Sequence, residues 1–233
     1  MKKLLITISI IHAFLLTIPM HALNQGYLFS IEGTEGCGKT TLIKNLEQAL
    51  TQENMNVVTT REPGATDLGK SVRSMLMNRS VPTCLLSEFL LFAADRAQHF
   101  HELILPALAA HKIVICDRMA DSSLVYQGYV KGLDQEIIKT INNLAMQKRK
   151  PNLVFYLKID AQTSCQRINC RNQTEAQDAF EAEILQKKQM LIDGYDAILT
   201  NRSDVIIIDA TQDAQTIAHQ VLQSILTYIK KND

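Results

Sequence analysis

The sequence predicts an α/β fold in which a five-stranded parallel sheet is flanked by helices. Two observations support this class. Short apolar runs rich in Val and Ile alternate along the chain with longer segments whose apolar residues recur at helical spacing. A glycine-rich loop joins the first apolar run to the first helical segment. Apolar runs that alternate with helices imply parallel strands covered by helices on both faces.

Each element can be assigned in chain order. Strands are expected at residues 27–31, 56–60, 112–116, 153–157 and 205–208. Helices are expected at residues 39–50, 68–77, 85–110, 122–129, 135–148, 161–171, 178–200 and 214–230, the third of them broken or bent near Pro106. The polar, weakly periodic stretch 172–177 predicts a mobile flap around residues 171–178.

Composition bounds the functional classes. The chain has 233 residues, of which 46% are hydrophobic and 21% charged, a size and balance that fit one ordinary α/β domain. Lys and Arg total 24, as do Asp and Glu, so no global basic field draws the chain to nucleic acid or an anionic membrane. The five cysteines form no C-x-x-C pair, which argues for a reducing compartment and against a disulfide framework or zinc site.

The first 22 residues differ from the rest. Two lysines precede the apolar stretch 4–18, and Ala22 stands at a possible cleavage site. The stretch is short for a membrane span, which needs about 20 apolar residues. Residues 1–22 are therefore expected to be an export signal, an anchor or an extension upstream of a start at Met20, and residues 23–233 the folded domain. A cytoplasmic location is expected, with export or membrane contact left open if the extension is retained.

The glycine loop carries the first chemical signal. Residues 33–40 fit the pattern G-x-x-x-x-G-K-[ST] between a strand and a helix, which indicates binding of a nucleoside triphosphate. Its backbone N–H groups point at phosphate oxygens, and the helix dipole adds positive potential. Candidate ATP-binding residues are Gly33, Thr34, Glu35, Gly36, Cys37, Gly38, Lys39, Thr40 and Thr41.

A second carboxylate signal follows the third strand. Asp117 ends the apolar run 112–116, as expected for a residue that holds Mg²⁺ directly or through water together with the Thr40 hydroxyl. No N-K-x-D motif for reading guanine is present, which argues against a GTPase.

Four blocks then point to one family. They are Glu32-Gly-Thr-Glu-Gly-Cys-Gly-Lys-Thr-Thr41, Thr60-Arg-Glu-Pro-Gly64, Leu91-Phe-Ala-Ala-Asp-Arg-Ala-Gln-His99, and Asp117-Arg118 with Asp121-Ser-Ser-Leu-Val-Tyr-Gln-Gly128. From about residue 26 to 230 the chain resembles bacterial thymidylate kinases, which phosphorylate dTMP to dTDP with ATP. The resemblance implies the fold of phosphate-loop nucleoside-monophosphate kinases, ATP and Mg²⁺ as cofactors, and a homodimer formed through the helices of residues 85–148.

The same resemblance implies how the thymine base is held. Phe92 falls where the family stacks the thymine ring, and Arg96 is expected at the thymine carbonyl and the phosphate side. Ser123 and Gln127 lie four residues apart, so one helix face can present a hydroxyl and an amide to the base edge. Tyr126 is expected beside the sugar, where it would exclude a 2′-hydroxyl.

The resemblance also implies how the phosphates are held. Arg73 is expected at the dTMP phosphate, and Arg118 is expected to bridge the donor and acceptor phosphates, since a guanidinium binds oxyanions in pairs. Arg61 belongs to the same group of blocks. A carboxylate in a phosphate loop repels phosphate, so Glu35 is expected to bind the acceptor's 3′-hydroxyl and to act as a catalytic residue with Lys39.

The chain departs from the family pattern in its flap. The phosphate loop carries no arginine at Gly36 or Cys37, which resembles the subtype that supplies this charge from the flap. The usual flap reads D-R-[FI]-E, but here residue 179 is alanine. Arg171, or Arg167, is therefore expected to replace the missing catalytic charge, because such an arginine can contribute about 10³-fold to the rate.

Other departures leave alternatives open. Met119 stands where the family usually has an aromatic residue and is expected to loosen the acceptor pocket. His99 and His101 match no metal-binding spacing and are expected to be surface or packing residues. One alternative is a catalytically weak nucleotide-binding protein. Another is a kinase of dUMP or thymidine, because an apolar pocket discriminates one methyl group by only about 1–3 kcal/mol.

Overall fold

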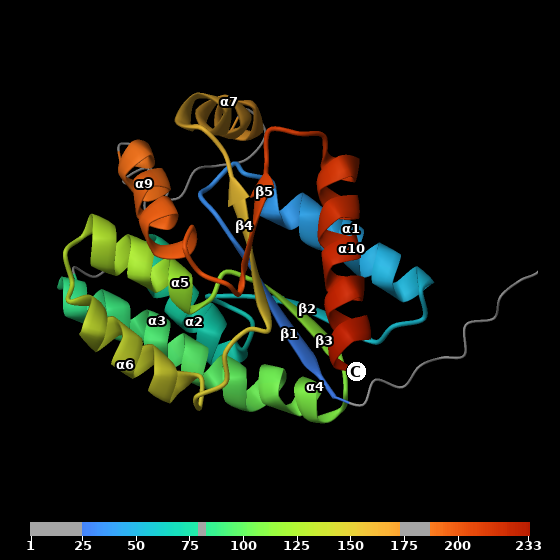
Figure 1. Ribbon diagram of the computed structural model, residues 1–233. Helices are drawn as coiled ribbons and strands as arrows, with labels where there is room; N and C mark the ends of the chain where they lie inside the picture. The colour runs from blue at the N-terminus through green and yellow to red at the C-terminus, as the bar shows by residue number, and fades with distance from the viewer. Residues whose placement is uncertain (1–24, 79–82, 173–186) are drawn as a thin grey trace, which may run out of the picture.

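The computed structural model describes residues 25–78, 83–172 and 187–233. Its five strands form one parallel sheet in the order β2-β3-β1-β4-β5, with β1 at the centre and buried along its length (Figure 1). The strands are β1 (Tyr27–Glu32), β2 (Val57–Arg61), β3 (Ile113–Asp117), β4 (Leu153–Lys158) and β5 (Val205–Asp209). The predicted fold class and the five predicted strands are confirmed.

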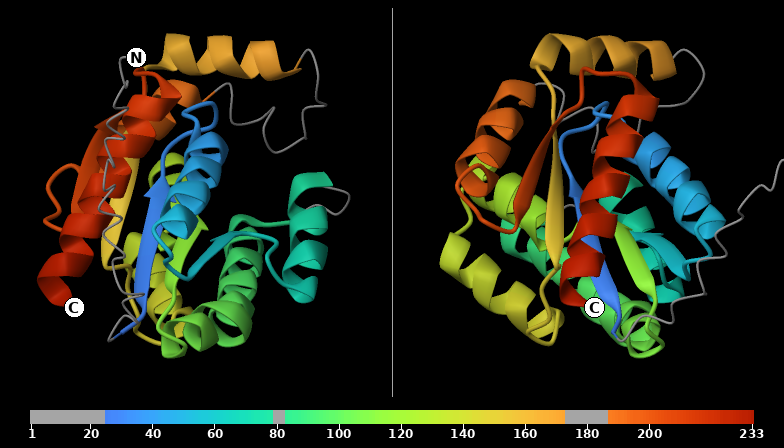
Figure 2. Two further views of the ribbon diagram at one scale, coloured as in Figure 1. Left: turned by 90° about the vertical axis from the view of Figure 1, so that its right-hand side faces the viewer. Right: turned by 45° about the vertical axis from the view of Figure 1, so that its right-hand side comes forward.

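Helices cover both faces of the sheet (Figures 1 and 2). They are α1 (Lys39–Gln52), α2 (Asp67–Asn78), α3 (Leu85–His99), α4 (Leu105–Ala109), α5 (Ala120–Ser123), α6 (Gln135–Ala145), α7 (Ala161–Asn172), α9 (Lys188–Leu199) and α10 (Ala214–Asn232), with π-helical segments η1 (Phe100–Ile104) and η2 (Leu124–Val130). Side chains alternate across β1, so Phe29 packs in the core under α1 and α10, whereas Leu28 packs toward Phe100 and Ile104 of η1.

The predicted interruption near Pro106 is confirmed, but two of the predicted helices contain π-helical turns that the sequence did not predict. The segment 85–110 is irregular at the π-helical turn η1, which precedes Pro106, and α4 then begins with the proline in its first turn. The segment predicted at 122–129 begins at Ala120 and is mostly the π-helical η2. Residues 1–22 and most of the predicted flap, with Ala179, lie outside the described residues. No helix in the described ranges has the length and apolar character needed to cross a membrane.

The parallel arrangement brings the phosphate loop and Asp117 together. The carboxyl ends of all five strands meet at one edge of the sheet, and Ile31 of β1 is paired with Asp117 of β3. The loop that follows β1 turns at Gly36, whose φ is +78° and whose missing Cβ would lie 2.7 Å from the backbone oxygen of Ser164. Gly38 caps α1, so the loop delivers its last residues to a helix N-terminus.

Candidate active site

One cavity of about 600 Å³ opens at this edge of the sheet. It joins the phosphate loop to residues from the three other sequence blocks. The predicted residues that line it are Glu35, Gly36, Gly38, Lys39, Thr40, Thr41, Arg61, Arg73, Phe92, Arg96, Asp117, Arg118, Ser123, Tyr126, Gln127 and Arg167. A second cavity of about 350 Å³ shares Thr40, Arg61 and Asp117 with the first.

Lys39 is held by the loop that it belongs to. Its Nζ donates to the backbone oxygens of Gly33 at 3.1 Å and Thr34 at 3.0 Å, and it lies 3.6 Å from the Cys37 sulfur. These partners are uncharged, so a phosphate oxygen can replace them and gain a charge-assisted bond. Gly33, Thr34 and Cys37 form the buried base of the loop and do not line the cavity.

Asp117 has one carboxylate oxygen without a hydrogen-bond partner among the described residues. Its Oδ1 is buried and accepts no hydrogen bond from the described residues. Buried carboxylate oxygens are almost always partnered. Thr40 and Asp117 line both cavities, so a hydroxyl residue and a carboxylate residue border the same space. This donor set is hard oxygen, the kind that Mg²⁺ prefers.

Glu35 and Arg118 form the ionic centre of the site. Arg118 Nη2 lies 2.7 Å from Glu35 Oε1, the Tyr126 hydroxyl donates to the same oxygen at 2.6 Å, and Lys188 Nζ lies 3.5 Å from Oε2. Burial alone would raise the pKa of Glu35, but the charges of Arg118, Lys188 and Lys39 lower it to about 2. The carboxylate is therefore ionised at neutral pH and neutralised by two cations.

The backbone of Arg118 is also unusual. Its φ is +68°, a left-handed conformation that non-glycine residues seldom adopt and that clusters at functional sites. Its Nη1 donates to Gly33 O at 2.8 Å, Tyr195 Oη at 2.8 Å and Ser122 Oγ at 3.2 Å. Arg118 thus connects the phosphate loop to α9.

Glu32 fixes the partners of Arg118 from beneath. Its carboxylate accepts from the Met119 N–H at 2.8 Å, the Ser122 hydroxyl at 2.7 Å and the Tyr195 hydroxyl at 3.2 Å. Burial, and then the neighbouring charge of Asp121, raise the pKa of Glu32 to about 7. Met119 is 1% exposed in the core cluster beside η1 and also lines the cavity, and the expected loosening of the acceptor pocket at this position stays a prediction.

Arg96 is the most deeply buried of the cations that line the cavity. It is 2% exposed, and its Nε donates to Glu62 Oε2 at 2.8 Å. Its Nη1 donates to Asn142 Oδ1 at 2.6 Å and to Ser123 Oγ at 3.3 Å, and its Nη2 donates to the backbone oxygen of Met119 at 3.1 Å. Arg96 lines the cavity, yet most of its hydrogen-bonding groups bind protein.

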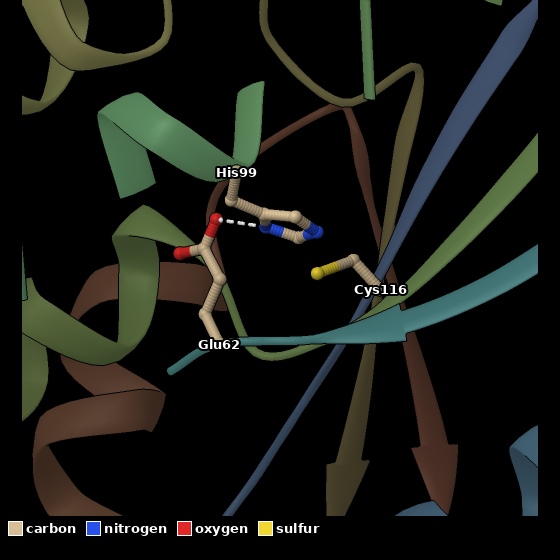
Figure 3. A group of neighbouring side chains, drawn as sticks. All are labelled: Glu62, His99 and Cys116. Carbon is tan, nitrogen blue, oxygen red and sulfur yellow. Dashed lines mark hydrogen bonds and ion pairs between the residues drawn. The ribbon is translucent and has the colours of Figure 1, made fainter. Parts of the chain in front are cut away.

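Behind Arg96, three side chains that could ligate a metal lie together. Glu62, His99 and Cys116 each bring one ligand atom within 4.8 Å of the others (Figure 3). His99 Nδ1 lies 3.0 Å from Glu62 Oε1, and its Nε2 lies 2.7 Å from the Thr60 hydroxyl. Burial raises the pKa of the Cys116 thiol well above its usual range, so the thiol is protonated in the hydrogen-bonded cluster. We interpret the cluster as a hydrogen-bonded support for Arg96. His99 is thus a packing residue, as expected, and His101 is exposed.

One wall of the cavity is built by α3 and η2. Phe92 lines the cavity from α3, and Gln127 lines it from η2, where the amide Nε2 donates to Glu88 Oε1 at 2.9 Å. Ser123, four residues before Gln127, also lines the cavity.

Arg73 reaches the cavity from α2, where its Nη1 donates to Pro63 O at 3.2 Å. A Cβ on Gly64, whose φ is +112°, would lie 2.9 Å from Arg73 Cδ.

Of the two arginines expected to replace the flap arginine, the structure describes the side chain of Arg167 only. Arg167 of α7 lines the cavity while its Nη1 donates to the backbone oxygen of Ala210 at 2.8 Å. Arg171 belongs to the last turn of α7, but its side chain lies outside the described part of the structure.

Sequence reasoning missed five residues that support the site: Glu62, Glu88, Asn142, Lys188 and Tyr195. Glu62 lies inside the recognised block of residues 60–64, and a charged residue directly before a proline in that block was the signal that could have pointed to it. Lys188 and Tyr195 lie on α9, more than 150 residues from Glu32 and Glu35 along the chain, and no local pattern marks them. A partner at that separation is visible only in the folded chain.

Comparison with known proteins agrees with this geometry. A family model described as Thymidylate kinase matches residues 31–221. A thymidylate kinase of Syntrophus aciditrophicus is 39% identical over 203 residues, which cover 84% of this chain and 93% of the relative. One of Exiguobacterium sibiricum is 37% identical over 210 residues, which cover 89% and 98%. The matched residues include the phosphate loop and the other three sequence blocks that line the cavity. The chain therefore belongs to the thymidylate kinase family.

Proposed function

We propose that the 600 Å³ cavity binds both substrates, with the ATP phosphates on the phosphate loop and dTMP between α2, α3 and η2. The reaction is that of the family, phosphorylation of dTMP to dTDP with ATP. The observation that carries the proposal is that Lys39, Arg73, Phe92 and Gln127 line one continuous space. Two polyanions must meet there, and catalysis then depends on positioning and positive charge.

Mg²⁺ fits the oxygen donors at the loop. We assign it to the Thr40 hydroxyl and to Asp117, whose unpartnered buried Oδ1 supports the assignment. When bound, the ion would supply positive charge that neutralises the charge developing on the phosphates. The chain's own part is to hold this pair of oxygens beside Lys39.

Lys39 and Arg118 supply the charges that the phosphates meet. Lys39 exchanges the carbonyls of Gly33 and Thr34 for phosphate oxygens without leaving a buried charge unpaired. Arg118 turns from Glu35 toward the transferred phosphoryl group, and Lys188 stays as the counter-ion of Glu35. Glu35 is then able to accept a hydrogen bond from the 3′-hydroxyl of dTMP.

The base pocket uses shape and hydrogen bonds. Phe92 stacks on the thymine ring, and Arg96 and Gln127 bind its polar edge. Tyr126 is held by Glu35 at 2.6 Å, which fixes its ring beside the sugar. Arg73 binds the acceptor phosphate from α2. Arg96, Tyr126 and Gln127 are buried, so little ordering of these side chains is needed when dTMP binds.

The flap arginine is the finest part of the proposal. We assign the catalytic flap charge to Arg171, since Ala179 cannot supply it. Ala179→Arg is the sharpest test. An increase in kcat of tenfold or more would show that the flap lacks a charge, whereas an unchanged kcat together with a loss in Arg171→Ala would support Arg171.

A homodimer through α3 and α6 is proposed as well. Leu86, Leu90, Ile137 and Leu144 are large apolar side chains exposed on these two helices. Light scattering on the full chain should give twice the monomer mass, and Leu90→Glu with Leu144→Glu should shift it to the monomer mass.

The activity itself is tested by ADP release. The purified full chain with ATP and Mg²⁺ should release ADP when dTMP is added, and much less with dGMP or thymidine. Lys39→Ala should abolish the stimulation while the chain stays folded. ATP binding without stimulation by any acceptor would favour a nucleotide-binding protein instead.

A further inference from the structure

The side-chain amide of Gln127 is held in one orientation. Gln127 is 1% exposed and lines the cavity, and its Nε2 donates to Glu88 Oε1 at 2.9 Å. An amide has two chemically different ends, a carbonyl that only accepts and an NH₂ that only donates. Which end faces the ligand decides whether the ligand must donate or accept a hydrogen bond.

Glu88 dictates that orientation. It is a buried residue of α3, and Lys131 Nζ contacts both of its carboxylate oxygens, at 2.9 and 2.8 Å. A carboxylate in an ion pair accepts hydrogen bonds and has none to donate. A flipped Gln127 would place its carbonyl oxygen against Glu88 Oε1, where two acceptors repel. The donor end of the amide therefore faces Glu88.

The acceptor end of Gln127 remains for a ligand. The amide Nε2 contact with Glu88 is the hydrogen bond that the described residues give this side chain. Its carbonyl oxygen is thus left to a partner in the cavity. The N3 atom of thymine carries a hydrogen and donates, whereas N3 of cytosine carries a lone pair and accepts. A fixed acceptor matches thymine and uracil, and repels cytosine.

We propose that Glu88 is a positioning residue that sets base specificity by holding the Gln127 amide with its carbonyl oxygen toward the base. This inference rests on the proposed contact between Gln127 and the base. It concerns the hydrogen-bonding edge only, so it predicts discrimination of dTMP from dCMP and none of dTMP from dUMP.

The test compares three acceptors in the full-length enzyme. In Glu88→Gln, residue 88 can pair with either end of the Gln127 amide, so the orientation is no longer fixed. We expect kcat/KM for dTMP to fall about tenfold through a higher KM for dTMP, with kcat/KM for dCMP unchanged or raised. The ratio of dTMP to dUMP and the KM for ATP should stay as in the wild type. Glu88→Asp keeps a carboxylate that can pair with Lys131, but its shorter side chain reaches less far toward Gln127. The ratio of kcat/KM for dTMP to that for dCMP should fall in this variant as well.

Controls separate specificity from folding. Glu136→Gln removes a carboxylate from another ion pair, with Lys139 at 2.7 Å, and should change no ratio. Melting curves report whether each variant is folded. An unchanged dTMP/dCMP ratio in folded Glu88→Gln and Glu88→Asp, with a large dTMP loss in Gln127→Leu, would overturn the inference alone. No dTMP loss in Gln127→Leu would overturn the base contact, and the inference with it.

Discussion

The two cationic regions of the cavity are built in opposite ways. On the base side, Arg96 is 2% exposed and donates to Glu62, Asn142, Ser123 and a backbone oxygen. On the phosphate side, Lys39 is held by two neutral carbonyls. Arg118 also makes four hydrogen bonds, but its side chain remains 18% exposed. The base side is fixed before the substrate arrives, whereas the phosphate side holds its charges on partners that can be exchanged.

The difference follows from what each region must recognise. A base is a rigid, neutral ring, so a pre-formed pocket discriminates best when its polar groups do not move. The phosphate side meets polyanions, so a cation such as Lys39 can exchange its neutral protein partners for phosphate oxygens and gain charge-assisted hydrogen bonds. In the proposed reaction, Lys188 would remain as the counter-ion of Glu35 when Arg118 turns toward the phosphates.

The largest effect is expected from breaking the fixed side. Arg96→Ala leaves Glu62 buried without its main counter-ion, and should lower the free energy of unfolding by about 3–5 kcal/mol. Urea denaturation measures the loss. Adding Glu62→Gln should recover part of it, and a loss that the second substitution does not reduce would show that the charge of Glu62 is not the cause.

The next effect comes from the phosphate side. Lys39→Ala should lower kcat by about 10²- to 10³-fold with little change in melting temperature, because its present partners are neutral and can remain satisfied by water. Steady-state kinetics and a melting curve give both values. Lys44→Ala, an exposed lysine on the same helix, is the matched control. Equal losses in the two variants would contradict the assignment.

Glu32, which hydrogen-bonds the partners of Arg118, should make the melting temperature depend on pH. Because burial raises the folded-state pKa of Glu32 from 4.5 to about 7, the folded protein holds this proton more tightly than the unfolded chain. Its contribution to stability is thus present below about pH 4.5 and is lost as the pH rises to about 7. We expect the melting temperature to fall by roughly 5 °C over this interval. In Glu32→Gln the fall should be smaller, and an unchanged profile would count against Glu32.

The smallest effect is expected from the counter-ion of Glu35. Lys188→Met removes the charge 3.5 Å from Glu35 Oε2 and the bond from Nζ to the Glu35 backbone oxygen at 3.2 Å. Arg118 should then be held more tightly by Glu35, and kcat should fall about tenfold while the KM for ATP changes little. Lys188→Arg should restore most of the rate. Lys158→Met, which removes a surface ion pair with Asp196 on the same helix, should leave it unchanged.

The sequence by itself determined the parts of the molecule that are local. Strand and helix periodicity predicted the α/β sheet, and the spacing of residues 33–40 predicted the phosphate loop, because a turn, a helix N-terminus and a lysine are set by neighbouring residues. The recognised blocks also named most of the residues that line the cavity. The sequence did not predict the π-helical segments η1 and η2, because each lies within a segment whose apolar residues recur at helical spacing.

Only the tertiary structure decided which charges are paired, and with what. Lys188 meets Glu35 across 153 residues and Tyr195 meets Glu32 across 163, on a helix that no motif connects to the loop. Arg96, read from sequence as a ligand-binding residue, is largely occupied by Glu62 and Asn142. The physical reason is that burial and electrostatic pairing depend on distance in space, and the chain fixes that distance only when its strands and helices have packed.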